Sequence, residues 1–171
     1  WGDRVFVTTA EPFGEVLEPR YSDVPGSHGN FPVTQFYKSV VLAVSRRDGT
    51  VLWRRTVREA LPHEGGHYTA SMASHSPVTD GEHLFAFFGS QGLYCLNLDG
   101  ELLWEKDLGK MQTRHGHGEG SSPVLHGNTL VINWDHQGDS FAIAFDKRTG
   151  EQRWRVEREE VTSWATPIVV E

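Results

Sequence analysis

Histidines are the residues in this chain whose type and spacing could do chemistry. The segment Arg114-His-Gly-His-Gly-Glu119 places two imidazoles and a carboxylate within six residues, with glycines that let the backbone curl. Neutral imidazole is a common metal ligand and a pH-responsive group. We therefore predict His115, His117 and Glu119 as candidate metal ligands. This spacing lacks the fixed pattern of a zinc finger or a metalloprotease helix, so a pH-sensitive contact surface and ordinary structural hydrogen bonding remain open as alternatives.

Familiar catalytic constellations are absent from the sequence. There is no Gly-x-Ser-x-Gly elbow, and the glycine-rich stretch Gly116–Gly120 lacks the Lys-Ser/Thr of a phosphate loop. Cys95 is the one cysteine, which excludes an intramolecular disulfide and disfavours a cysteine-based zinc site. We predict no catalytic and no cofactor-binding residues, and the sequence favours a non-enzymatic role.

The charge and hydropathy of the chain exclude two classes of partner. Its formal net charge is −7, which disfavours a polyanion such as nucleic acid as a partner of the whole surface. No apolar run approaches the ~20 residues of a membrane-spanning helix. The 18 glycines among 171 residues fit a turn-rich globular protein.

A repeat of about fifty residues organises the chain. Its first marker is a tryptophan that follows a glycine-containing turn, and the three copies are Trp53, Trp104 and Trp154, after Gly49, Gly100 and Gly150. The second marker is a Ser/Thr-Pro-Val/Ile triplet that begins at residues 76, 122 and 166. Each repeat divides into four short strands separated by turns, and no segment of similar length shows helical periodicity.

Four-stranded antiparallel units at this period predict an all-β fold, a β-propeller built of blades. A single blade cannot bury both of its faces, so neighbouring blades must stack on it. We interpret the repeated tryptophans and glycines as structural blade-docking residues, because a large ring fills the gap between sheets and glycine permits close approach. We expect residues 1–171 to form a single partial propeller of about three repeats.

The complete pattern Ala-x-Asp-x-x-Thr-Gly-x-x-x-Trp at Ala144–Trp154 resembles the tryptophan-docking repeat of the pyrroloquinoline-quinone-type propellers. Segment Ala43–Trp53 matches with two substitutions, and Cys95–Trp104 is one residue shorter. The chain is most similar to quinoprotein-like repeat proteins of environmental bacteria. Related propellers include quinone-dependent dehydrogenases and a lipoprotein of outer-membrane protein assembly. The resemblance implies a periplasmic or extracellular location.

Quinone catalysis by this chain alone is disfavoured. The dehydrogenases that it resembles bind calcium through oxygen ligands and place an adjacent-cysteine disulfide against the cofactor, and this chain has one cysteine. Three blades also cannot enclose the quinone. The cofactor therefore stays unknown, although Asp135, Asp139 and Glu119 could act as oxygen ligands.

Propeller topology predicts that all the long segments lie on one face. These are an insertion at residues 10–37 and links at residues 58–73 and 105–120. Long loops in a compact domain usually serve function, so this face is where a protein or small-molecule ligand is expected. Six of the nine histidines fall in connections on this face: His28, His63, His67, His115, His117 and His136. His63, Glu64 and His67 form a second candidate group.

Both ends of the sequence fall within expected strands, which predicts either a piece of a longer protein or copies that associate. Two copies would supply six blades, and an open stack would otherwise leave apolar end faces. The leading functional hypothesis is a non-enzymatic binding or scaffolding propeller with an unknown ligand. The alternatives are part of a quinone- or metal-dependent oxidoreductase whose other blades are missing, and a purely structural module.

Overall fold

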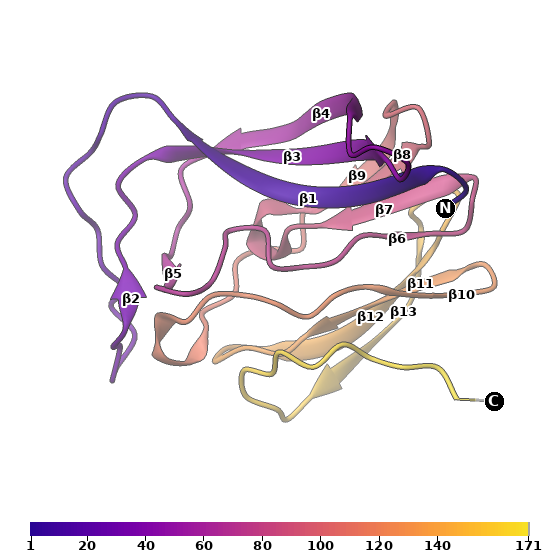
Figure 1. Cartoon of the computed structure of the whole chain (residues 1–171). Coiled ribbons are helices and arrows are strands. Elements are labelled where there is room, and N and C mark those ends of the chain that lie inside the picture. Colours follow the sequence, from indigo (N-terminus) through magenta and orange to yellow (C-terminus); the bar gives the residue numbers. More distant parts are fainter. Residues whose placement is uncertain (171) are drawn as a thin grey trace.

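The computed structural model describes residues 1–170, which form three antiparallel β-sheets stacked on one another (Figure 1). We call the sheets blades 1, 2 and 3. Blade 1 comprises β1 (Arg4–Phe13), β3 (Phe36–Ser45) and β4 (Val51–Ala60). Blade 2 comprises β6 (Val78–Thr79), β7 (His83–Phe87), β8 (Leu93–Asn97) and β9 (Leu102–Lys106). Blade 3 comprises β10 (Val124–His126), β11 (Thr129–Trp134), β12 (Ser140–Asp146) and β13 (Gln152–Arg158).

Smaller elements lie in the connections between these strands. β2 (Asn30–Phe31) pairs with β5 (Gly66–His67). Two short 3-10 helices, η1 (Gly89–Gln91) and η2 (Arg114–Gly116), also lie in these connections. None of the helices within residues 1–170 is long and apolar enough to cross a membrane. The predicted all-β architecture is confirmed, and blades 2 and 3 have the four strands expected of each repeat.

Blade 1 and the C-terminal marker differ from the prediction of four strands per repeat. Blade 1 has three strands, and the triplet Thr166–Ile168 is not part of a strand. In blades 2 and 3 a strand begins at the last residue of the triplet and pairs with the next strand in sequence, β6 with β7 and β10 with β11. Within the described residues, no strand follows this third triplet.

The predicted insertion is shorter than residues 10–37. β1 and β3 continue into it as a paired ladder from Ala10↔Ser39 to Phe13↔Phe36, so the connection between them covers residues 14–35. Paired strands satisfy the backbone N–H and C=O groups that a loop would leave to water, and the Phe13 and Phe36 rings pack 5.9 Å apart at the end of the ladder.

The alternation of side chains along β7 explains why three sheets stack. Phe85 and Phe87 point to one face and join a cluster with Ile132 of blade 3. Leu84 and Ala86 point to the other face and join a cluster with blade 1. All four β7 side chains are fully buried, so the middle blade is covered on both faces, as the period of two along a strand requires.

The repeated tryptophans connect each blade to the next one. Trp53 of blade 1 donates a hydrogen bond from Nε1 to the Leu98 carbonyl of blade 2 (2.9 Å), and its ring lies against Gly100. Trp104 of blade 2 bonds to the Lys147 carbonyl of blade 3 (3.1 Å), with its ring against Gly150. A Cβ at Gly150 would stand 2.8 Å from the Trp104 ring, and both glycines have positive φ. Each glycine therefore permits both its hairpin turn and the ring that covers it.

The two remaining docking residues lie on the outer faces of the stack. Trp154 is 42% exposed, and nothing lies within 4 Å of a Cβ placed on Gly49. The outer blades also expose apolar side chains, among them Val156 on β13 and Leu52 on β4. Blade 3 thus presents a tryptophan, and blade 1 a glycine hairpin, without a neighbouring blade in the described residues.

An ion pair reinforces the contact between blades 2 and 3 at the short-turn end. The Lys147 ammonium lies 2.7 Å from the Asp80 carboxylate, and both side chains are largely buried. Burial alone would raise the pKa of the Asp80 carboxyl. The Lys147 ammonium and the backbone N–H groups of Glu82 and His83 outweigh burial and hold that pKa well below its usual range.

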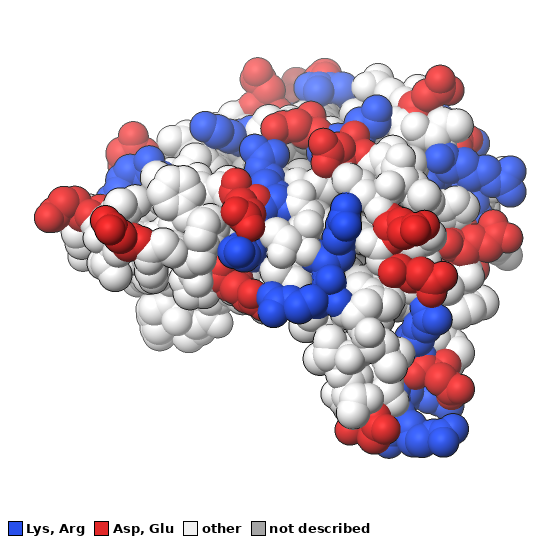
Figure 2. Space-filling model, turned by 90° about the horizontal axis from the view of Figure 1, so that it is seen from above, with Lys and Arg blue, Asp and Glu red and all other residues white. Residues whose placement is uncertain are grey.

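The face of the molecule seen in Figure 2 carries acidic and basic side chains interspersed, with no field of one sign. Two ion pairs of blade 1 follow this pattern, Lys38 with Glu59 (3.1 Å) and Arg54 with Glu11 (2.5 Å). A nucleic-acid surface requires a concentrated basic stripe, which this face does not have.

Candidate functional site

The long connections gather at one end of the blades, as predicted. The insertion, the link between blades 1 and 2 (residues 61–77) and the link between blades 2 and 3 (residues 107–123) lie at the end where β2 and β5 pair (Figure 1). We call this end the loop face. The His67 N–H donates to the His117 carbonyl (3.0 Å), so all three segments are joined by backbone hydrogen bonds.

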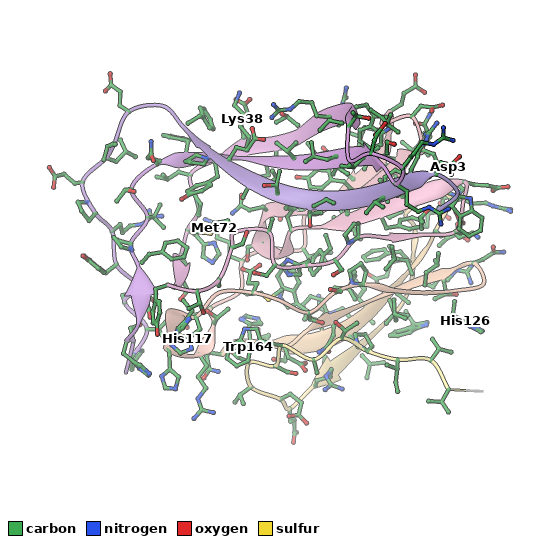
Figure 3. The ribbon with its side chains drawn as sticks, viewed as in Figure 1. Asp3, Lys38, Met72, His117, His126 and Trp164 are labelled. Atoms are coloured by element: carbon green, nitrogen blue, oxygen red, sulfur yellow. The ribbon has the colours of Figure 1, made fainter. Side chains whose placement is uncertain are left out.

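Four imidazoles meet on the loop face and form what we call the histidine cluster: His28, His67, His115 and His117. The ring centroids of successive neighbours are 4.7 to 5.3 Å apart. His28 comes from the insertion, His67 from the first link, and the other two from the second link. Figure 3 shows His117 at this end and His126 at the opposite end. The sequence predicted the loop face for all four but could not show that they meet.

Backbone carbonyls hold the histidine cluster in place. The Nδ1 atoms of His28 and His115 both contact the Gly26 carbonyl (2.8 and 3.1 Å), and His117 Nε2 contacts the His28 carbonyl (3.0 Å). His115 is also the one described residue other than glycine with a positive φ, 59°. A positive φ is uncommon for residues other than glycine, and the contacts of the His115 ring offset the energetic cost of this backbone conformation.

Glu119 faces away from its predicted partners His115 and His117. Its carboxylate accepts hydrogen bonds from the Ser90 N–H (2.6 Å) and the Ser90 hydroxyl (2.5 Å). Ser90 Oγ also accepts from the Met111 N–H (2.7 Å), which ties the second link to η1. Among residues 1–170, no group of three or more His, Cys, Asp or Glu side chains is arranged to hold a metal ion. Metal binding by His115, His117 and Glu119 stays a prediction.

Burial dominates the electrostatics of Glu119. It raises the pKa of the carboxyl to about 7, although the two hydrogen bonds from Ser90 act in the opposite direction and the nearby Glu64 raises it further. Gly89 makes this contact possible, because a Cβ at that position would overlap the Glu119 carboxylate. The Glu119 carboxylate therefore joins the link between blades 2 and 3 to η1 of blade 2.

The three side chains of the second candidate group, His63, Glu64 and His67, contact different parts of the molecule. His63 Nε2 lies 2.6 Å from the Met111 carbonyl, and His67 belongs to the histidine cluster. Glu64 accepts from the Ser22 hydroxyl (2.9 Å) and from the Thr113 N–H and hydroxyl (both 3.1 Å). Glu64 thus joins the insertion to the second link.

His75 is the residue that sequence reasoning missed. Its side chain is 4% exposed, its ring lies edge-on to Phe87 with centroids 4.8 Å apart, and neither ring nitrogen has a hydrogen-bond partner among the described residues. Burial lowers the pKa of His75 to about 4. His75 directly precedes the triplet that begins at residue 76, and nothing in its sequence neighbours indicates burial.

Two residues relevant to a calcium–quinone site, Asp135 and Cys95, do not fit that role. Asp135, one predicted oxygen ligand, is 3% exposed and already accepts two hydrogen bonds from the Arg158 guanidinium (2.8 and 3.2 Å). Cys95 is buried in the core, and burial raises the pKa of its thiol to about 12. Asp135 is thus engaged within blade 3, and Cys95 belongs to the core between blades 2 and 3, so neither offers a free ligand.

Comparisons with known proteins agree with this architecture. A family model described as outer membrane protein assembly factor BamB matches residues 37–170. The crystal structure of BamB from Moraxella catarrhalis is similar over 91% of this chain and 44% of its own, with a TM-score of 0.54 and 15% identity. A europium-containing methanol dehydrogenase is similar over 86% of this chain and 26% of its own, with a TM-score of 0.50 and 13% identity.

This chain therefore spans less than half of the length of either structure. At such identities the likeness shows the fold alone, and it confirms the predicted propeller of the quinoprotein type. No curated protein matches the chain.

Proposed function

The chain belongs to the family described as outer membrane protein assembly factor BamB, and we propose that it is a non-enzymatic binding or scaffolding propeller whose loop face holds a protein partner. The observation that carries this proposal is the joining of three segments from different blades into one surface by the histidine cluster. A rigid scaffold that presents linked loops is the usual arrangement of a recognition surface.

The location that fits this proposal is the periplasm or the extracellular space. The support is the family to which the chain belongs, whose described role is outer-membrane protein assembly. Exposed aromatic side chains suit a partner surface. On the loop face, Tyr68 (71% exposed) packs against His67 of the histidine cluster, and Tyr21 (67% exposed) belongs to the insertion.

Photo-crosslinking tests the proposal in cells that produce the full protein. With benzoylphenylalanine at position 21 or position 68, the same protein is expected to be captured from both positions. The matched control is His126, an exposed residue at the opposite end of the blades, where no adduct is expected (Figure 3). Equal capture from position 126, or none from either tyrosine position, would contradict a partner surface on the loop face.

The alternative is part of a quinone- or metal-dependent oxidoreductase that draws further ligands from other blades. Turnover of a substrate by the purified protein, lost on changing His115 or His117, would favour it over binding. A purely structural module would instead give no crosslinked partner at position 21 or 68 and would tolerate alanine at each histidine of the cluster. These outcomes separate the three roles.

For the outer faces of blades 1 and 3, we propose that copies of the chain bind one another. The exposed Trp154 of one copy would lie on the Gly49 hairpin of another, as Trp53 lies on Gly100 and Trp104 on Gly150. Native mass spectrometry of the chain is expected to show a dimer that Trp154→Ala converts to monomer. The same spectrum tests metal binding, because a retained metal adds its own mass. A monomeric wild-type chain would remove this proposal.

A further inference from the structure

A cavity lies beneath the loop face between blades 1 and 2. β3 supplies Tyr37 and Ser39, the first link supplies His63, Glu64, Met72 and His75, and the segments at Phe88–Gln91 and Gly118–Glu119 complete the wall. Figure 3 labels Met72 on the first link. The cavity has a volume of about 50 Å³, so it suits a small ligand.

Two imidazoles bring unused hydrogen-bonding capacity to this cavity. His63 Nε2 faces the Met111 carbonyl at 2.6 Å and therefore donates its proton there, which leaves Nδ1 as a lone-pair acceptor. That Nδ1 is buried and has no partner among the described residues. Neutral His75 adds one further acceptor nitrogen and one N–H, neither of them paired. A buried polar group without a partner is costly, so a ligand that pairs with it gains free energy.

The charge of the cavity wall is acidic. The residues that line it include Glu64 and Glu119 but no lysine or arginine. The two carboxylates are close enough for Glu64 to disfavour ionisation of Glu119. The other titratable groups of the wall are Tyr37, His63 and His75, so no fixed positive charge offsets the Glu64 carboxylate.

We propose that this cavity binds the protonated amino group of a small organic amine. An ammonium group has three N–H donors and a positive charge, which match the acceptor nitrogens of His63 and His75 and the carboxylate of Glu64. An alcohol of the same size has one donor and no charge, and a carboxylate is repelled. The half-buried Met72 and the buried Phe88 give the alkyl part of the ligand an apolar contact.

Isothermal titration calorimetry with three ligands of matched size tests this inference: propylammonium, 1-propanol and propionate. Propylammonium is expected to bind saturably at one site per chain, and the other two are not expected to bind. Equal binding of 1-propanol would overturn the assignment of an ammonium site. So would the absence of saturable propylammonium binding up to about 10 mM.

Two variants locate the site, and one serves as the control. Glu64→Gln and His75→Phe are each expected to weaken propylammonium binding at least about tenfold, since each removes an interaction with a charged group. Glu82→Gln makes the same chemical change at an exposed turn at the other end of the blades and is expected to bind like the wild type.

Circular dichroism establishes that each variant is folded before titration. Unchanged affinity in both folded cavity variants would place the ligand elsewhere and refute the site. The inference does not depend on the proposed partner surface, because crosslinking at positions 21 and 68 is measured separately from amine binding.

Discussion

Replacing Trp104 by alanine is expected to lower the free energy of unfolding by about 3 kcal/mol. The change removes a ring that packs on Gly150 and lies 5.9 Å from the Phe85 ring, and it leaves the Lys147 carbonyl with only the weak Cys95 thiol donor. Urea denaturation followed by far-ultraviolet circular dichroism measures the change without relying on tryptophan fluorescence.

Trp154→Ala is the matched control, because it makes the same change at the same position of the repeat. Trp154 is 42% exposed and lies on the outer face of blade 3, so the loss is expected to stay below about 1 kcal/mol when both proteins are measured at a concentration low enough for the monomer. Similar losses at Trp104 and Trp154 would show that the tryptophan stabilises its own blade, and not the contact between blades.

Between pH 4.5 and pH 7 the wild-type chain is expected to lose about 3 kcal/mol of stability relative to the Glu119→Gln variant. Folding raises the pKa of Glu119 from 4.5 to about 7, mainly through burial. In this window the unfolded chain releases the proton that the folded chain retains. The contribution is therefore fully present below pH 4.5 and is lost as the pH rises through 7.

The comparison with a variant is needed because the contribution of His75 to stability changes with pH in the opposite direction. Burial lowers its pKa from 6.5 to about 4, so its contribution is present above pH 6.5 and is lost as the pH falls toward 4. Subtracting the denaturation curves of Glu119→Gln from those of the wild type at each pH cancels the His75 contribution. A pH-independent difference would mean that the Glu119 carboxylate is solvated in the folded chain.

The parts of the fold that the sequence predicted are those encoded locally. Turn glycines, alternating apolar residues and the tryptophan four positions after each turn glycine all lie within one repeat. That period alone indicated stacked four-stranded sheets and placed the long loops on one face. The ends of β1 and β3 were missed because their ladder is set by pairing across the insertion, which no local signal marks.

The candidate site depends on contacts far apart in sequence. His115, His117 and Glu119 are neighbours in the chain, but the positive φ values at His115, Gly116 and Gly118 reverse the backbone and send Glu119 to Ser90. The partners of the two histidines come from the insertion and the first link. Spacing along the chain therefore identified the right segment of the loop face but could not identify which side chains share a site.

The tryptophan–glycine contact between blades has a direction. In each case the ring belongs to the earlier blade and the hairpin to the later one, so the contact joins two different surfaces. Copies of the chain that associate through it form heterologous interfaces, and the two outer faces cannot pair with themselves. Such copies close into a cyclic assembly when the rotation from one copy to the next divides a full turn, and otherwise they extend as a filament. The angle at which one tryptophan ring lies on one glycine hairpin thus decides between a closed and an unlimited assembly.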